Sequence, residues 1–372
     1  MRILVAPDKF KGSLDAGAVA ASIGLGLRDA WPEAEIRLLP LADGGEGTAS
    51  VICSAAGGEW VTSDAHDAFG TPIAARYGLI RSEGTAVMEM SEAAGLWRIP
   101  REQRDADLAS SFGIGEMLLH AAQSGASKII IGLGGSATND GGVGMARALG
   151  VQFIDAAGKD LAGRISELAR LAHIRAPEIL GLPRLIAAAD VRNPLLGPTG
   201  ATRVFGAQKG ATSEQTELLE AALTRLADIV KSDLGMDFRD ATGAGAAGGL
   251  GFGLMSFCGA KIRSGFDVVA KAVGLEDAVR RADAVVTGEG RLDAQTLDGK
   301  APAGVARLAR RLGKKVYAIV GEVEDAAMVR DLFDAIFVVE RGGQTRASAI
   351  LNAADLLRET ARTSAKHFCC RL

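Results

Sequence analysis

The chain of 372 residues has few cysteines, little net charge and no run of basic residues. The four cysteines, Cys53, Cys258, Cys369 and Cys370, lack the spacing of zinc ligands, and two of them are adjacent, which argues against both a metal centre and a disulfide framework. A formal net charge of −3 argues against nucleic acid or an anionic membrane surface as a partner.

Long apolar runs are also missing. No segment reaches the length of a membrane span, and the N-terminal run at residues 3–5 is too short for a secretory signal. We therefore expect a cytoplasmic protein with reduced cysteines that binds neither membranes nor nucleic acids. Whether it is a monomer or a homodimer stays open.

Short apolar segments alternate with helical patterns along most of the chain. We expect strands at residues 3–5, 35–39, 128–133, 151–154, 185–189, 284–287, 315–320 and 335–339, and helices at about 15–30, 49–56 and 213–232. The segment 59–90 has strand–turn–strand punctuation and predicts antiparallel strands or a crossing between domains. Short apolar strands that alternate with helices are typical of parallel sheets, so the sequence predicts an α/β fold.

The length of the chain favours two domains. We expect residues 1–79 and 263–372 to form a discontinuous Rossmann-like α/β domain, because both outer segments share a regular strand–helix rhythm. Residues 80–262 are then a second, inserted α/β domain with mostly parallel strands.

A loop with six glycines follows an apolar strand in "IIIGLGGSATNDGGVG", residues 129–144. Glycine lets backbone N–H groups approach an anion closely, so this loop predicts a phosphate site. Its candidate ligand-binding residues are Gly134, Gly135, Ser136, Thr138, Asn139, Asp140, Gly141 and Gly142. The whole chain lacks a GxxxxGK[ST] motif, so the cations for a bound phosphate must come from other loops.

Lys9 and Lys11 follow the first strand and project to the same side of an extended loop. They lie at the carboxyl end of a parallel strand, where open α/β sheets bind ligands. Two solvated surface lysines are an equally good interpretation.

Two further segments begin helices. Asp43 opens "DGGEGT", whose three glycines favour a backbone that faces a ligand over a simple helix start. Ser110 and Ser111 precede another helix, where capping is the simpler explanation and substrate binding the alternative.

Asp190 ends a strand, Asn193 lies in the following turn, and Lys209 stands beside a glycine. A carboxylate at a strand end can hold Mg²⁺ or accept a hydroxyl proton, and an aspartate that merely closes a turn is equally compatible.

Glu289, Arg291 and Asp293 alternate along the loop after the strand at 284–287, and Lys300 follows. So much charge directly after an apolar strand favours a functional loop over a surface ion pair. In contrast, the GxGxxG match at 243–248 follows no strand-like segment, so its glycines are expected to permit close packing rather than dinucleotide binding.

Taken together, the segments APDKFKGS, LADGGEGT, ASSFGIGE, GLGGSATNDGGVGMARALG, DVRNPLLGPTGA with VFGAQKGA, TGAGAAGGLG and TGEGRLDAQTLDGKAPAGVA resemble the type I (bacterial) glycerate kinase family. They occur in the family's order and extend from residue 1 to about 305. One departure is Lys9, which stands where many relatives have serine.

The resemblance implies ATP- and Mg²⁺-dependent phosphorylation of D-glycerate, with the active site in a cleft between two α/β domains. The 2-phosphoglycerate product is favoured and 3-phosphoglycerate is possible. The alternatives are a nucleotide-dependent oxidoreductase and a non-catalytic sugar-acid sensor on the same scaffold.

Combined with the residues, the resemblance yields a set of expected roles. The catalytic candidates are Asp190, Lys11, Lys209 and Arg291; the substrate-binding candidates are Lys9, Asp43, Ser110, Ser111 and Asn193; and the Mg²⁺ ligands are Asp293 and Glu289. Asp190 is assigned to the glycerate hydroxyl, with Lys300 as a possible further cation.

Overall fold

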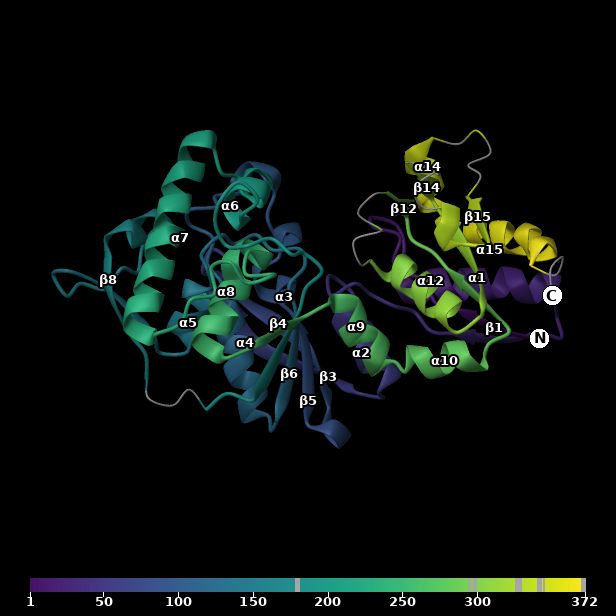
Figure 1. Cartoon of the computed structure of the whole chain (residues 1–372), viewed down its shortest axis with the longest axis horizontal. Helices are drawn as coiled ribbons and strands as arrows, with labels where there is room; N and C mark the ends of the chain where they lie inside the picture. Colours follow the sequence, from purple (N-terminus) through teal and green to yellow (C-terminus); the bar gives the residue numbers. More distant parts are fainter. Residues whose placement is uncertain are drawn as a thin grey trace. The chain divides into compact units, whose positions relative to one another are not determined.

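The computed structural model describes residues 1–177, 181–293, 296, 300–324, 330–339, 343 and 345–368 (Figure 1). None of the helices in these ranges is long and apolar enough to cross a membrane.

The chain divides into two compact units, one made of residues 1–43, 50–56 and 264–372 and the other of residues 44–49 and 57–263. The first large boundary lies at residue 57, whereas the sequence analysis places it at residue 80. The reason is that residues 59–80 form two antiparallel strands that pair within the sheet of the second unit.

The first unit contains a five-stranded parallel sheet in the order β15-β13-β11-β1-β2. Its strands are β1 (Arg2–Val5), β2 (Glu35–Leu38), β11 (Ala284–Thr287), β13 (Lys315–Val320) and β15 (Ala335–Val338). Numbered within the unit, this is the doubly wound order 2-1-3-4-5. The direction of winding reverses between β1 and β11, and ligands bind at such a switch point.

Both faces of this sheet are buried. Ile3 and Val5 pack with the apolar sides of α1 (Ala16–Ala30) and α15 (Ala353–Ser364), which run side by side (Figure 1). The intervening Leu4 points to the opposite face and is equally buried. Burial on both faces explains why these strands read as continuous apolar runs.

The remaining elements of this part of the chain are α2 (Thr48–Ala55), α9 (Gly265–Ala272), α10 (Leu275–Arg281), α12 (Ala301–Arg311), α14 (Arg346–Leu351), the short β12 (Arg291–Leu292) and β14 (Glu322–Val323), and the 3₁₀ turns at Arg330–Leu332 and Ala365–His367.

The second unit contains a six-stranded sheet in the order β10-β9-β6-β5-β4-β3. Its strands are β3 (Glu59–His66), β4 (Pro72–Ile80), β5 (Thr85–Glu89), β6 (Lys128–Gly132), β9 (Arg184–Ala188) and β10 (Lys261–Arg263). Strands β5, β6, β9 and β10 are parallel to one another. Strands β4 and β3 extend the sheet with antiparallel pairing. The prediction of a mixed α/β fold with mostly parallel sheets is confirmed.

Helices and a small hairpin complete this unit. The helices are α3 (Ser91–Ala94), α4 (Phe112–Gln123), α5 (Val143–Ala148), α6 (Ala201–Phe205), α7 (Ser213–Leu234) and α8 (Ala246–Cys258), with 3₁₀ turns at Arg81–Glu83, Leu96–Arg98, Arg101–Gln103, Ile165–Arg170 and Ala207–Lys209. The expected strand at 151–154 forms as β7 (Gln152–Asp155), but it pairs in antiparallel fashion with β8 (Leu171–Arg175) outside the parallel sheet. Its expected place in the parallel sheet is therefore wrong.

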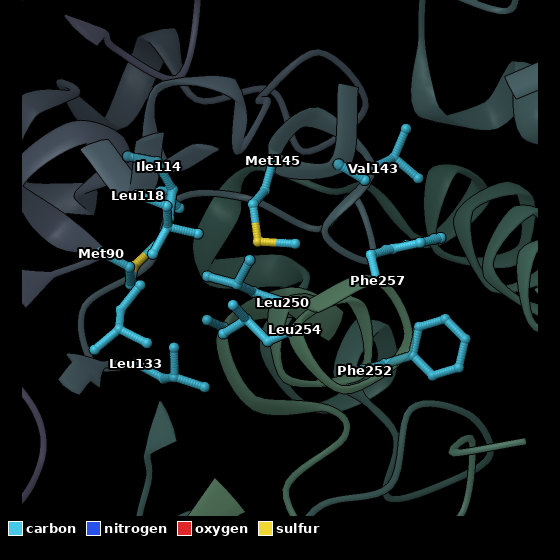
Figure 2. Packing of buried hydrophobic residues seen from close by; sticks show 14 of the residues in the cluster. Met90, Ile114, Leu118, Leu133, Val143, Met145, Leu250, Phe252, Leu254 and Phe257 are labelled. Carbon is cyan, nitrogen blue, oxygen red and sulfur yellow. The ribbon is translucent and has the colours of Figure 1, made fainter. Parts of the chain in front are cut away.

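The core of the second unit is built where its helices meet. Figure 2 shows Met145 of α5 pointing toward Leu250 of α8, with Ile114 and Leu118 of α4 beside Met90. All five side chains are fully buried. This core supports the glycine-rich loop between β6 and α5 from within.

Candidate active site

Three carboxylates follow strands at the switch point of the first sheet. Asp8 comes after β1, Asp43 after β2 and Glu289 after β11. The Asp8 N–H donates to the Gly288 carbonyl at 2.8 Å, which holds the loops after β1 and β11 together. The sequence analysis names Asp43 and Glu289 but misses Asp8, although an acidic residue directly after an apolar strand was the available signal.

Two of these carboxyl groups, Asp8 and Glu289, have raised pKa values. Burial, reinforced by the charges of Asp43 and Glu289, raises the pKa of Asp8 to about 7, and the charge of Lys9 opposes this shift. Burial also raises the pKa of Glu289 to about 7, against a hydrogen bond from the Thr296 hydroxyl at 2.7 Å. A cation placed here would remove the cost of ionising both groups.

Glu289, Asp293 and Lys300 come together as expected. The Lys300 Nζ lies 3.4 Å from the Asp293 Oδ1 and 4.0 Å from the Glu289 Oε2. Arg291 does not join them. Its guanidinium pairs with Glu324 at 2.9 Å, and both side chains are about half exposed beside β12 and β14.

The donor set fits a magnesium ion in part. Among the described residues, no three histidine, cysteine, aspartate or glutamate side chains are arranged to hold a metal ion by themselves. Mg²⁺ is, however, commonly held by one or two carboxylates together with substrate phosphates. The buried carboxyl oxygens of Asp8 and Glu289 are suited to that partial coordination.

We expect the stability of the metal-free protein to fall as the pH rises from 5 to 8. Asp8 keeps its proton in the folded state up to a pKa of about 7 and loses it near pH 4 when unfolded, so its stabilising contribution disappears as the pH rises through 7. The loss attributable to Asp8 is about 2–3 kcal/mol. Chemical denaturation with EDTA measures it, and Asp8→Asn should flatten the profile.

Adding Mg²⁺ should raise the denaturation midpoint more at pH 8 than at pH 5, because the ion competes with protons for the same oxygens. An equal effect of Mg²⁺ at both pH values, or an unchanged profile in Asp8→Asn, would contradict this interpretation.

Lys9 and Lys11 have different surroundings. The Lys9 N–H donates to the Asp8 Oδ1 at 2.7 Å, and its side-chain charge acts on the same carboxyl. Lys11 is exposed and lines a cavity of about 100 Å³ that Arg346 and Gly290 also border. The cavity wall therefore carries two cationic side chains and the acidic Glu322, and most of its other lining residues are apolar.

In the second unit, only the tip of the glycine-rich loop reaches the surface. Gly135 is exposed and Gly134 is half-buried, whereas Thr138, Asn139 and Asp140 are fully buried. The part of this loop that can meet a ligand directly therefore narrows to 134–136. The side chains of Thr138, Asn139 and Asp140 face the interior, and their expected part in binding the nucleotide stays a prediction.

Several glycines of this loop are explained by packing. A Cβ on Gly132 would lie 2.7 Å from the Gly44 carbonyl oxygen, and a Cβ on Gly134 would collide with the backbone of Gly45. A Cβ on Gly142 would lie 2.9 Å from the Gly253 Cα. Gly141 faces the leucines of α7 in the same manner. Gly135 is the exception, because its φ of +72° leaves it facing open space apart from one contact.

Asp140 holds the loop together through internal hydrogen bonds. Its carboxylate accepts hydrogen bonds from the Ser111 N–H at 2.8 Å, the Ser111 hydroxyl at 2.6 Å, and the N–H groups of Gly142 and Gly144 at 3.0 Å each. Ser111 also accepts from the Met145 N–H at 2.9 Å. Both residues are fully buried, and the expected substrate contact of Ser111 stays a prediction.

Ser110 and Asn193 also make local bonds. The Ser110 hydroxyl accepts from the Phe112 N–H at 3.2 Å just before α4, whereas the N-cap residue of this helix, Ser111, makes no side-chain capping bond. The Asn193 amide donates to the Thr199 carbonyl at 2.7 Å and closes its own loop.

Lys209 is buried beneath the loop tip, with 2% of its surface exposed. Its Nζ donates to the Ser136 hydroxyl at 2.8 Å and to the Thr138 carbonyl at 2.6 Å. Burial lowers the pKa of Lys209 to about 7, and the charge of Asp140 opposes the shift. The expected catalytic role of Lys209 stays a prediction, and in this structure its ammonium group contacts protein oxygens.

Asp190 lies at the same sheet edge as the loop tip. Strands β6 and β9 are parallel neighbours, and the Leu133 N–H donates to the Ala188 carbonyl at 3.0 Å where both strands end. Asp190 follows β9 by two residues and is half-buried. It remains a candidate for the acceptor hydroxyl.

Glu89, at the end of β5, is a structural residue that the sequence analysis misses. Its Oε1 accepts from the N–H groups of Gly47 at 3.0 Å and Ala49 at 2.9 Å. These amides begin a helix and were expected to face a ligand, but an internal carboxylate occupies them. The available signal was a lone acidic residue in the apolar segment TAVMEM.

The GxGxxG segment at 243–248 packs as predicted. It follows a turn and no described strand, and a Cβ on Gly248 would collide with the backbone of Thr138. The Gly141 N–H donates to the Gly248 carbonyl at 3.1 Å. These glycines seat the kinked start of α8 against the loop, which removes the main argument for an oxidoreductase.

Comparisons with known proteins match one family over nearly the whole chain. The model of the glycerate kinase family matches residues 3–369. The chain is 41% identical to a glycerate kinase of Bacillus subtilis (strain 168), over 97% of this chain and 96% of the relative. It is also 41% identical to a glycerate 2-kinase of Escherichia coli (strain K12), over 98% and 97%.

A crystal structure from Salmonella typhimurium LT2 that is assigned to glycerate kinase 2 superimposes with a TM-score of 0.87. The two sequences are 44% identical, and the match covers 99% of this chain and 98% of the other.

Proposed function

The chain belongs to the glycerate kinase family, and from this premise we propose that it transfers the terminal phosphoryl group of ATP to D-glycerate and forms 2-phosphoglycerate. The glycerate 2-kinase among its relatives supports this choice of product. One structural observation carries the proposal: buried carboxylates with raised pKa values, Asp8 and Glu289, occupy the switch point of the first sheet. A cation would stabilise the ionised form of both groups, and Mg²⁺-dependent phosphoryl transfer uses such a cation.

Mg²⁺ would neutralise charge on the phosphate oxygens of the nucleotide. Glu289 and Asp293 would hold it, with Asp8 beside them. Lys300 adds a second positive charge next to this pair. Arg291 has no part in this scheme, because Glu324 already pairs with it.

The backbone of 134–136 would bind phosphate oxygens through its N–H groups, since this is the exposed part of the glycine-rich loop. Asp190 would orient the glycerate hydroxyl and accept its proton. Lys11 would pair with the glycerate carboxylate, which is costly to bury without a cation. We propose that the reaction takes place in the cytoplasm, where ATP is supplied.

Incubation of the protein with D-glycerate, ATP and Mg²⁺ tests this function. Enolase converts 2-phosphoglycerate directly to phosphoenolpyruvate, whereas 3-phosphoglycerate must first be isomerised by a mutase. We therefore expect the absorbance of phosphoenolpyruvate to rise when enolase is added without mutase. Signal only after mutase addition would assign the other hydroxyl. Binding of glycerate without ADP release would instead support a sensor.

Gly135→Val is expected to raise the KM for ATP by about tenfold or more while the KM for glycerate stays nearly constant. A branched side chain at φ +72° would both strain the loop tip and block the approach of an anion. Steady-state kinetics with each substrate varied in turn measures the difference.

Gly158→Val is the matched control, because Gly158 has a φ of +83° with open space around it in the hairpin between β7 and β8. It should cost similar stability and leave both KM values unchanged. Unaltered ATP kinetics in a folded Gly135→Val protein would place the nucleotide elsewhere.

A further inference from the structure

A buried lysine supports the single hydroxyl of the exposed loop tip. Lys209 closes a 3₁₀ turn at Ala207–Lys209 and reaches Ser136 with its Nζ at 2.8 Å. Ser136 is 8% exposed and lies next to the exposed Gly135. The lysine therefore lies on the protein side of the hydroxyl, and the ligand-accessible surface lies on the other side.

The chemistry of this pair gives the hydroxyl a direction. An ammonium group has three donors and no acceptor, so the Ser136 oxygen must accept the bond from a charged Lys209. The hydroxyl hydrogen then has to point elsewhere. Within the described part of the chain, no group accepts it. The second donor of Lys209 is taken by the Thr138 carbonyl at 2.6 Å.

The loop tip around this hydroxyl is held in place. The Leu96 N–H donates to the Gly135 carbonyl at 2.8 Å, and the Ala137 N–H donates to the Ala94 carbonyl at 2.9 Å. Ser136 therefore lies between two backbone hydrogen bonds, and its side chain is secured by the lysine. A donor held in this way loses little conformational freedom when an anion binds.

We propose that Lys209 is a positioning residue that makes Ser136 a directed hydroxyl donor to a phosphate oxygen of the nucleotide. This rests on the proposed function of the loop as the nucleotide site. A Walker lysine places its positive charge in direct contact with the phosphate. In this protein the charge of Lys209 would act on the phosphate through the Ser136 hydroxyl. Polarisation by the ammonium strengthens that hydrogen bond in a region from which water is largely excluded.

Three variants test the proposal: Ser136→Ala, Lys209→Met and the double variant. Ser136→Ala should raise the KM for ATP and the calorimetric dissociation constant of ADP by about tenfold or more, the effect of losing a hydrogen bond to a charged group. Lys209→Met keeps the length of the side chain without its charge and should show a similar loss. The KM for glycerate should stay within about twofold.

The double variant separates the proposed mechanism from a direct contact. If Lys209 acts through Ser136, the double variant should bind ADP no more weakly than the weaker single variant. If the lysine reached the phosphate itself, the two losses would multiply, and this outcome would overturn the proposal. Unchanged ADP binding in Ser136→Ala would overturn it as well, even if Lys209→Met fails to fold.

Thr202→Val is the control for loss of loop stability. The Thr202 hydroxyl accepts from the Asn139 amide at 2.9 Å, a buried bond in the same loop that does not involve the tip. This variant should lower the melting temperature and leave ADP binding unchanged. If the wild-type protein forms no ADP from ATP and glycerate, the proposed function fails, whereas an active wild type with an unaffected Ser136→Ala refutes only the inference.

Discussion

Asp190→Asn is expected to lower kcat by a factor of about 10³, and no concentration of Mg²⁺ should restore it. The substitution keeps the shape of the side chain and removes the base that would accept the glycerate proton, a role that contributes about 10²–10⁴ in comparable reactions. Asp190 follows β9 at the edge where the exposed loop tip begins, which favours this role. Steady-state kinetics across a Mg²⁺ titration measures both features.

Asp293→Asn is the informative partner, because Asp293 lies next to Glu289 and Lys300 in the first unit. If it holds the metal, a higher Mg²⁺ concentration should recover part of its activity. Recovery of Asp190→Asn by Mg²⁺ would exchange the two roles. Full activity in both variants would remove both residues from the mechanism.

Lys11→Met is expected to lower kcat/KM for glycerate by about a hundredfold, the loss of one strong charge-assisted contact. The methionine preserves the apolar stem along the cavity that Arg346 also lines, so the charge alone is removed. Activity assays with glycerate varied at saturating ATP measure this effect.

Lys159→Met, an exposed lysine in the hairpin after β7, is the control and should behave as wild type. If Lys11→Met behaves in the same way, Lys11 is a surface lysine, and the cationic partner of the glycerate carboxylate must be sought elsewhere.

Periodicity predicted the strands well because burial on both faces leaves a strong signal. The expected segments at 284–287 and 315–320 coincide with β11 and β13. The segment at 151–154 was also recognised as a strand, but its neighbours were not. Whether a short strand joins a sheet or forms a hairpin depends on contacts that local patterns do not contain.

The candidate site is harder to predict than the strands, because glycine permits both phosphate binding and close packing of backbone segments. Glycines at 132 and 134 suggest phosphate binding, yet other backbone segments lie where their Cβ atoms would be. Asp140 and Lys209 carry charge in glycine-rich segments and are nevertheless buried in internal hydrogen bonds. Sequence patterns locate such loops, but only the fold decides which atoms face outward.

Asp8 illustrates the opposite error. The sequence predicts ligand-binding roles for its neighbours Lys9 and Lys11, because a phosphate needs cations. The surplus of negative charge becomes visible only when the loops after β1, β2 and β11 are brought together, since their residues are far apart along the chain.

Residues 44–49 determine which fragments of the chain could fold independently. They belong to the second unit although the chain on both sides of them belongs to the first. A fragment of residues 57–263 would lack the backbone N–H groups of Gly47 and Ala49, which donate to Glu89. It would also lack the backbone of Gly44, which packs against Gly132. Such a fragment would remove two hydrogen-bond donors from the buried Glu89 carboxylate, and an independently folding version would need residues 44–49 restored, for example through a circularly permuted chain.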